Sequence, residues 1–398
     1  MLVVGGGPAG ADLACGLARA GVSVALVERL QRPEQAAFSS AALPLQALQQ
    51  FGLPAQVVAS RWNGWQLIGP DGQRRQWQQP AVLGAVLDFA ALRRWQLQQA
   101  AGWGAQVQLG CTALGCQAVD GAMVTTVRQA DGRCTGITSS WVVDATGQAR
   151  TLLGEPDPCA HPLVAGVGLE WLLAVDQPLW EPWSGRLSFM LGSQWVRQGY
   201  GWIFPMQPGQ LKVGVCRLID PQQPQPALGR SLETLLARCD LGSATVLDRH
   251  GGAIRSTVSR QEPHSRGRLI GLGDAVSTAN LLGGEGIRHA LASSRTLLPL
   301  LLDAIGRQRQ GRDEGEQLRA LVPYRRLLQK QLGWRWPLSG RLACRTWLGL
   351  ASNRADRRLE RLLRGLEGVR ADQLSALLFD YRFERYGWRA LPYLLGLR

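Results

Sequence analysis

Three glycines close to the N-terminus have the spacing of a phosphate-binding turn. Gly5, Gly7 and Gly10 follow the apolar residues 2–4 and precede a helical pattern over residues 11–20. In this spacing the first glycine permits a tight turn, the second lets the backbone approach a pyrophosphate, and the third lets helix and strand pack closely. The N–H groups at the start of the helix attract phosphate oxygens.

An acidic residue completes this motif. Glu28 ends a second apolar stretch, residues 22–27, and lies 18 residues after Gly10. A carboxylate at this distance can accept hydrogen bonds from the ribose hydroxyls of a dinucleotide. The alternative, a glycine-rich turn between two core elements, leaves Glu28 without a role. We therefore predict a dinucleotide site made of these residues: Gly5, Gly7, Pro8, Ala9, Gly10 and Glu28.

A second segment carries residues that suit a flavin. The apolar residues 269–272 lead into Gly273 and Asp274, and a glycine-rich turn at residues 283–286 precedes another helical pattern. An aspartate at the end of a strand can accept hydrogen bonds from a ribityl chain. A glycine-rich helix start can bring N–H groups against a flavin ring and stabilise the negative charge of the reduced ring. The alternative is an ordinary strand, turn and helix.

The elements around these motifs indicate an α/β chain with more than one part. Strand and helix patterns alternate in the first 160 residues, several strands without a long helix follow up to residue 218, and the last hundred residues are helical and rich in Arg and Leu. We predict a Rossmann-like FAD-binding domain, an inserted antiparallel-sheet substrate domain and a C-terminal helical region. The expected bounds are 1–160 and 255–305 for the FAD-binding domain (with substrate-side strands near 60–85), 161–254 for the substrate domain and 306–398 for the helical region.

The charge of the chain indicates which partners it can bind, and its cysteines indicate the redox compartment. The net charge is +14, and residues 301–398 hold 20 Lys and Arg against 10 Asp and Glu, which favours an anionic partner. The arginines are interleaved with Leu and Trp and form no nucleic-acid motif, so we expect no nucleic acid to bind. The eight cysteines have neither CxxC nor zinc-ligand spacing, which indicates reduced thiols in the cytoplasm and no metal site.

Three segments resemble the geranylgeranyl reductase family, which lies within the FAD-dependent oxidoreductases of aromatic-hydroxylase type fold. GDAVSTANLLGGEGI (273–287) is similar to that family's flavin-binding segment, QGYGWIFPMQPGQLKVGV (198–215) to its G-Y-x-W-x-F-P…VGV segment, and AALPLQALQQFGLP (41–54) to the region after its nucleotide fold. The third of these segments is the most discriminating, because hydroxylases usually lack it. The resemblance covers roughly residues 1–300.

The resemblance implies roles for named residues. Asp274 would hold the ribityl-pyrophosphate of FAD, and Gly284, Gly286 and Ile287 would hold the isoalloxazine. The residues that would line an isoprenoid cavity are Tyr200, Trp202 and Phe204. These three alternate along a strand, so they can share one face, although a plain aromatic core stripe has the same pattern. No second GxGxxG is present, so NADPH or another electron donor would bind transiently.

The expected function is reduction of double bonds in an isoprenoid or similar lipophilic substrate. Catalytic residues are unknown: Tyr200 is a conceivable proton donor, and His289 reads better as a helix histidine. The chain departs from the family where Ser39-Ser40-Ala41, Gly84 and Leu281 replace Cys-Gly-Gly, Arg and Pro. The alternatives are a flavin monooxygenase or halogenase, a flavin-dependent carotenoid cyclase, and a catalytically degenerate flavin-binding protein.

The basic C-terminal region suggests peripheral contact with an anionic membrane surface. Residues 341–366 place leucines (342, 348, 359, 362 and 363) and arginines (345, 354, 357, 358, 361 and 364) at helical spacing, with Trp334, Trp336 and Trp347 in or beside them. Leucines and tryptophans would contact lipid, and arginines would contact its charged surface. The alternative is an amphipathic helical cap on the flavin domain, with solvated arginines.

Overall fold

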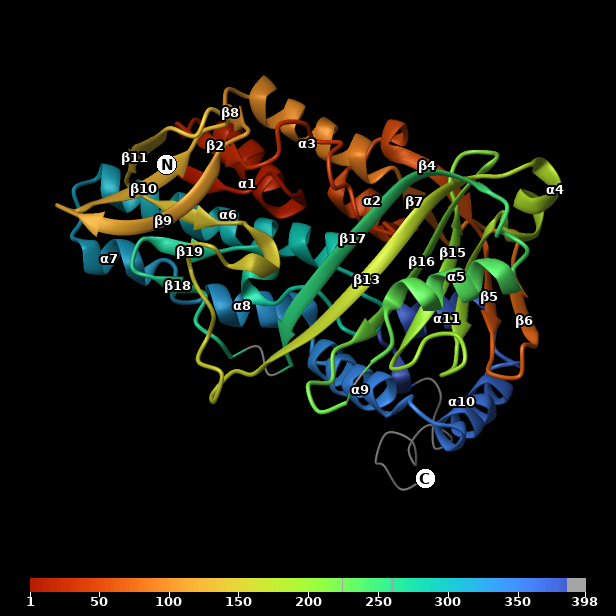
Figure 1. Cartoon of the computed structure of the whole chain (residues 1–398). Coiled ribbons are helices and arrows are strands. Elements are labelled where there is room, and N and C mark those ends of the chain that lie inside the picture. The colour runs from red at the N-terminus through yellow and green to blue at the C-terminus, as the bar shows by residue number, and fades with distance from the viewer. Residues whose placement is uncertain (224, 259–260, 385–398) are drawn as a thin grey trace.

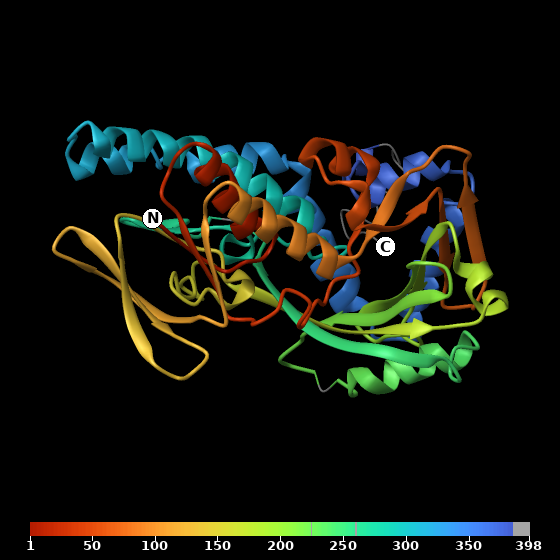
Figure 2. The same cartoon turned by 90° about the horizontal axis from the view of Figure 1, so that it is seen from above.

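The computed structural model describes residues 1–223, 225–258 and 261–384. Figures 1 and 2 show two sheets side by side, with the first 30 residues in and around one and the helices of residues 335–378 against the other. This mixed α/β fold, with a parallel nucleotide sheet, antiparallel sheets and C-terminal helices, is the one that the sequence predicts.

The nucleotide sheet has six strands, in the order β18-β19-β12-β1-β2-β8, and all neighbours except β18 and β19 are parallel. The strands are β1 (Leu2–Val4), β2 (Ala25–Glu28), β8 (Gln106–Leu109), β12 (Val142–Asp144), β18 (Ser265–Arg266) and β19 (Leu269–Gly271). The central strands are short, apolar and fully buried, as in sheets that are covered on both faces. Helices α1 (Pro8–Arg19), α3 (Phe89–Gly102) and α6 (Ile287–Arg309) pack side by side on it, and the antiparallel strands β9 (Thr112–Val119), β10 (Ala122–Arg128) and β11 (Cys134–Ser139) share its core.

The larger sheet has seven strands, in the order β17-β13-β16-β15-β14-β5-β6. They are β5 (Gly64–Ile68), β6 (Arg74–Gln78), β13 (Leu163–Ala174), β14 (Arg186–Leu191), β15 (Gly199–Pro205), β16 (Gln210–Leu218) and β17 (Thr245–Thr257). All pairs are antiparallel except β14 with β5. The sheet therefore combines strands from residues 64–78 with strands from residues 163–257. Helices α4 (Gln177–Trp180) and α5 (Leu228–Arg238) lie in its connections.

A small sheet explains one departure from the family pattern. It pairs β7 (Gly84–Leu87) with β3 (Ala42–Pro44) and β4 (Val58–Trp62), and α2 (Leu45–Phe51) follows β3. A Cβ on Gly84 would lie 2.2 Å from the carbonyl oxygen of Leu43 and 2.5 Å from Cζ2 of Trp62. No side chain fits at Gly84, because the backbone of β3 and the Trp62 ring occupy the space.

The structure contradicts the lipid contacts that were expected for the C-terminal helices. These helices are α7 (Glu314–Arg319), α8 (Tyr324–Leu332), α9 (Arg335–Gly349), α10 (Asn353–Gly365) and α11 (Ala371–Leu378), and we call the last three the C-terminal cap. Most of the expected lipid-facing residues are buried, so their expected contact with a bilayer is wrong: Trp336, Leu342, Trp347, Leu359 and Leu363. Leu348 and Leu362 are half-buried, and Trp334 is exposed. Each helix of the cap turns its apolar face toward the protein, because the seven-stranded sheet offers an apolar surface to cover. In the described part of the chain, no helix combines the length and apolarity that crossing a membrane requires.

Candidate functional site

The three N-terminal glycines are needed for different reasons. Gly5 has φ +110°, and a Cβ there would lie 2.3 Å from the carbonyl oxygen of Ala145. A Cβ on Gly10 would lie 2.0 Å from the carbonyl oxygen of Gly5, so these two glycines are fixed by the packing of turn, helix and sheet. A Cβ on Gly7, the N-cap of α1, would meet nothing within 4 Å. The open space therefore lies at the helix N-terminus, where a pyrophosphate fits.

Glu28 is held at this turn by two backbone groups. The N–H of Gly6 donates to its Oε2 at 2.6 Å, and the N–H of Leu30 donates to its Oε1 at 3.0 Å. Because Glu28 is only 7% exposed, its orientation is fixed, and the lone pairs left on each oxygen suit ribose hydroxyls. Pro8 occupies the first turn of α1 and costs no hydrogen bond there.

Two buried polar residues beside the turn, Arg93 and Gln96, were not predicted from the sequence. Gln96 on α3 donates from Nε2 to the carbonyl oxygen of Pro8 at 3.4 Å, while its Oε1 has no hydrogen-bond partner in the described chain. Arg93 donates to the carbonyl oxygen of Gln35 at 3.0 Å, and burial lowers the pKa of its guanidinium. A sequence pattern could have indicated them, because Arg93 and Gln96 are three residues apart and therefore lie on the same face of the helix as its apolar residues.

The flavin motif meets the first motif at one end of a cavity. Asp274 lies in a short helical turn, Gly273–Val276, directly after the nucleotide sheet, and its Oδ1 accepts a hydrogen bond from Thr278 Oγ1 at 2.8 Å. A Cβ on Gly286 would lie 3.7 Å from Asp274 Oδ2. The cavity lining at this end includes both motifs, through Pro8, Asp274, Gly284, Gly286 and Ile287. These residues fit the ribityl and isoalloxazine parts of FAD, because the glycines leave room beside a carboxylate and a helix N-terminus.

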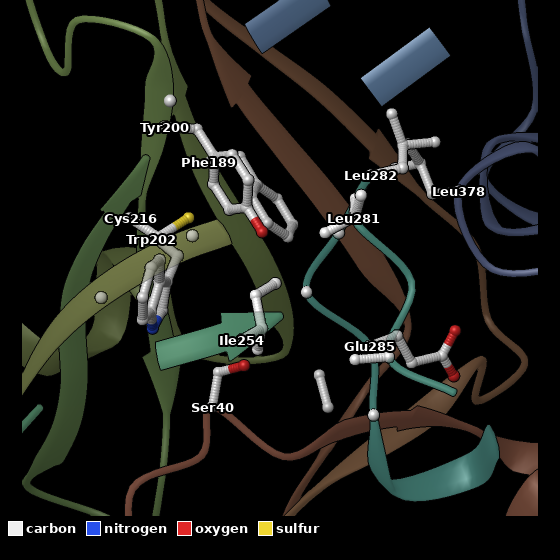
Figure 3. A pocket seen from close by; sticks show the side chains of 18 of the residues that line it. Ser40, Phe189, Tyr200, Trp202, Cys216, Ile254, Leu281, Leu282, Glu285 and Leu378 are labelled. Atoms are coloured by element: carbon white, nitrogen blue, oxygen red, sulfur yellow. The ribbon is translucent and has the colours of Figure 1, made fainter. Parts of the chain in front are cut away.

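From the flavin-loop end, the cavity extends along the seven-stranded sheet to the C-terminal cap. Its volume is about 460 Å³, and most of its lining is apolar. Tyr200, Trp202 and Phe204 share one face of β15 and line the same wall, with Phe189 beside them. Figure 3 shows Tyr200, Phe189 and Trp202 on one side of the cavity and Leu281, Leu282 and Leu378 on the other. The aromatic stripe of the sequence is therefore both core and cavity wall.

Tyr200 brings a protic group to the flavin end of this wall. Its hydroxyl lies 3.5 Å from the position that a Cβ on Gly284 would take, and its ring packs 4.9 Å from Trp347. Burial raises the pKa of the Tyr200 phenol well above its usual value, and burial raises the pKa of the neighbouring Cys216 to about 12. Both groups therefore keep their protons at neutral pH.

Behind Trp202 a buried carboxylate and a buried ammonium fix the wall. Trp202 Nε1 donates to Glu170 Oε2 at 3.0 Å, and Lys212 Nζ donates to the carbonyl oxygen of Ser39 at 2.6 Å. Burial raises the pKa of Glu170 and lowers the pKa of Lys212. A Cβ on Gly214 would lie 2.2 Å from Cζ2 of Trp202, so the glycine of the VGV segment makes room for the indole. Neither Glu170 nor Lys212 was predicted from the sequence to belong to the site.

Of the other residues singled out in the sequence, some line the cavity and one does not. Leu281 and Ser40, at positions where the chain departs from the family, line the cavity. His289 does not, since it is buried behind the flavin loop with Nδ1 3.1 Å from the carbonyl oxygen of Glu285, which agrees with a helix histidine. Among the described residues, no group of three or more His, Cys, Asp or Glu side chains is arranged to hold a metal ion.

Comparison with known proteins identifies an FAD-binding segment at the N-terminus and similar reductases. Residues 1–64 match the family model described as FAD binding domain. A menaquinone reductase from Mycolicibacterium smegmatis is 27% identical over 324 residues, with 76% of each chain covered. A digeranylgeranylglycerophospholipid reductase from Haloferax volcanii is 26% identical over 310 residues, with 74% of this chain and 73% of that protein covered.

Solved structures show the same fold. A geranylgeranyl bacteriochlorophyll reductase-like protein from Thermoplasma acidophilum superposes with a TM-score of 0.83 at 20% identity, over 100% of this chain and 98% of the other. Fold and site together define an FAD-dependent oxidoreductase. More narrowly, the chain is a distant relative of digeranylgeranylglycerophospholipid and menaquinone reductases.

Replacing Asp274 tests its predicted contact with FAD. We expect Asp274→Ala to weaken FAD binding by about 2 kcal/mol, roughly 30-fold, because a charged hydrogen-bond acceptor is lost. Flavin fluorescence during titration of the deflavinated protein measures the dissociation constant. Thr278→Val is the control, since it removes only the hydroxyl that donates to Asp274. An unchanged constant for Asp274→Ala would mean that this carboxylate only stabilises the turn.

Proposed function

We propose that the protein uses FAD to reduce double bonds of an isoprenoid or similarly lipophilic substrate. The observation that carries the proposal is a largely apolar cavity that begins at the flavin loop and continues to the C-terminal cap. A long hydrocarbon chain fits such a lining, because burial of apolar surface favours binding by about 25 cal/mol per Å². The related menaquinone and digeranylgeranylglycerophospholipid reductases support this assignment.

Residues in different parts of the site would have different roles. The N-terminal turn with Glu28, and the loop with Asp274, would hold FAD; when bound, FAD supplies the hydride for the reduction. Trp202 and Phe204 would orient the substrate chain, and the cavity wall would exclude water. Tyr200 would hold a proton at its Oη beside the flavin loop, where a substrate carbon needs one. The electron donor would be NADPH or another molecule that binds transiently.

The rival enzymes share the fold. A p-nitrophenol 4-monooxygenase from Pseudomonas putida superposes with a TM-score of 0.69 at 17% identity, and a myxobacterial chondrochloren halogenase with 0.66 at 17%. At these identities the likeness concerns the fold alone. A cyclase that uses reduced flavin without net redox change also fits an apolar cavity, and a degenerate flavin-binding protein would retain the cavity without turnover.

Anaerobic turnover separates these functions. Photoreduced holoprotein is mixed with geranylgeraniol or a menaquinone, and the products are analysed by mass spectrometry. A reductase adds two hydrogens per double bond and oxidises the flavin; a cyclase changes the structure without changing the mass. A peroxyflavin spectrum on admission of oxygen would favour a monooxygenase or halogenase. Fully reduced flavin together with unchanged substrates, and no peroxyflavin on admission of oxygen, would favour the degenerate protein.

We further propose that the outer face of the cap binds an anionic membrane surface by charge. Exposed arginines of α9 and α10 point away from the buried leucines, and Trp334, just before α9, is 65% exposed. The exposed members are Arg341, Arg345, Arg354, Arg357, Arg361 and Arg364. Near an anionic leaflet each contributes about 1 kcal/mol, within a Debye length. This face lies on the helices that close the cavity, which suits delivery of a substrate from a bilayer.

Liposome co-sedimentation tests this surface. We expect pelleting with anionic liposomes at low salt and release at high salt, and little pelleting with neutral liposomes. Substituting Arg354, Arg357 and Arg361 with Gln should remove most of the binding. Exposed arginines elsewhere provide a control of equal charge change: Arg309, Arg312 and Arg319. The protein remaining in solution with anionic liposomes at low salt would rule out the membrane contact.

A further inference from the structure

The glutamate of the flavin loop, Glu285, is part of the cavity lining, but its carboxylate points away from the cavity. Gly284 and Gly286 line the cavity on either side of Glu285, whose carboxylate points to the opposite side of the loop (Figure 3). Its Oε1 accepts a hydrogen bond from Arg288 Nε at 2.7 Å, and its Oε2 accepts one from Arg288 Nη2 at 2.9 Å. This two-point pairing of guanidinium and carboxylate fixes both side chains. The flavin loop is therefore anchored from behind.

The same guanidinium holds the segment that follows α11. Arg288 Nη2 also donates to the carbonyl oxygen of Phe379, and Nη1 donates to Asp380 Oδ1 at 3.3 Å. Tyr381, with φ +54°, turns its hydroxyl back to Glu285 Oε2 at 3.1 Å. Residues 379–381 thus contact the flavin loop through two independent side chains, although almost a hundred residues separate them from it in sequence.

This segment is also cavity wall. Phe379 lines the cavity and packs on Trp62 at 5.9 Å and on Trp65 at 5.7 Å between ring centroids. Trp65 Nε1 donates to Ser375 Oγ of α11 at 2.8 Å, so the helix before the segment is fixed to the sheet. A displacement of Phe379 changes the shape of the cavity. A displacement of the flavin loop moves Glu285 and Arg288, which are hydrogen-bonded to residues 379–381.

We propose that Glu285, Arg288 and Tyr381 couple the two halves of the site, so that FAD and a lipophilic ligand in the cavity each strengthen the binding of the other. The proposal rests on the proposed function, since it requires that the cavity binds a lipophilic ligand. FAD orders the loop at Gly284 and Gly286, and through Arg288 the ordered loop positions Phe379 against the ligand. By linkage, the ligand must strengthen FAD binding by the same factor.

The test is a linkage measurement in the full chain. FAD is titrated into the deflavinated protein, with and without saturating geranylgeraniol, and flavin fluorescence gives the dissociation constant. We expect geranylgeraniol to tighten FAD binding about fivefold or more in the unaltered protein, the range of measured couplings. In Arg288→Ala this factor should fall to near one. Arg288→Lys, which keeps the charge but loses the fork, should retain part of it.

Two further variants separate coupling from general damage. Tyr381→Phe removes one hydroxyl without opening a cavity and should reduce the factor. Arg295→Ala, on the same helix, removes an exposed ion pair with Asp12 that does not touch the C-terminal segment, and should leave the factor unchanged. A smaller FAD affinity in Arg288→Ala with an unchanged factor would assign the arginine a merely structural role and overturn the proposal.

Direct binding of labelled geranylgeraniol by equilibrium dialysis distinguishes the two possible failures. If geranylgeraniol binds to the unaltered protein but leaves the FAD dissociation constant unchanged, the coupling is wrong and the proposed function stands. If neither geranylgeraniol nor a menaquinone binds, the proposed function and the coupling are both overturned.

Discussion

Gly7→Val should fold normally and lose FAD. A Cβ at Gly7 would meet no protein atom within 4 Å, and its φ of −71° is accessible to any residue, so the stability of the apoprotein should change little. The added side chain would occupy the space beside the helix N-terminus that a pyrophosphate needs. We expect FAD binding to weaken by about 100-fold or more, equivalent to about 2.7 kcal/mol. Flavin content after purification, and titration of the apoprotein, measure the effect.

Gly10→Val provides the contrast. Here the Cβ would overlap the carbonyl oxygen of Gly5 at 2.0 Å, so the variant should lose about 4 kcal/mol or more of folding stability. Thermal unfolding of the two apoproteins distinguishes a blocked ligand site from a broken turn. A Gly7→Val protein that purifies with full flavin would show that the pyrophosphate lies elsewhere.

Tyr200→Phe should lower turnover by about 100-fold, the usual minimum contribution of a general acid. The phenylalanine ring keeps the packing against Phe189 and Trp347, so the affinities for FAD and for the lipophilic substrate should stay close to their original values. Burial raises the pKa of Tyr200, so the hydroxyl stays protonated through the neutral range, and activity should not fall there through its ionisation. Single-turnover oxidation of the reduced flavin by the substrate isolates this step.

Tyr324→Phe is the matched control. Tyr324 is buried at the start of α8, outside the cavity, and the change removes the same hydroxyl from a comparable environment. Turnover in this variant should be unaffected. Near-normal single-turnover rates in Tyr200→Phe would assign protonation to a water molecule and leave Tyr200 as part of the wall.

The arrangement of the elements proposed to hold the nucleotide was predictable because its parts are close in sequence. A strand, a glycine turn, a helix and a second strand with Glu28 occupy 28 residues. Gly5 and Gly10 are required by the packing of this turn, and Gly7 leaves open the space in which a pyrophosphate fits. The same holds for Asp274 and the glycine-rich start of α6. Alternation along β15 likewise predicted that Tyr200, Trp202 and Phe204 share one face.

The partners of these residues required the tertiary structure. Glu170 lies 32 residues from Trp202, and Arg288 lies 92 residues from Asp380, so no local pattern joins either pair. From the sequence alone, Gly84 stands where the related family has an arginine. The structure shows that the Trp62 ring occupies the space that a side chain at this position would need. Each of these contacts depends on which strands and helices become neighbours, and that is decided by the packing of the two sheets.

The C-terminal cap shows most clearly which features the sequence determines and which depend on the tertiary structure. Leu and Arg at helical spacing determine, from the sequence alone, that α10 has one apolar and one basic face. The spacing does not determine what covers the apolar face, because lipid and a protein core are equally apolar surroundings for Leu359 and Leu363. Only the folded chain places those leucines in the cavity wall against the seven-stranded sheet and leaves the arginines of the opposite face in contact with solvent.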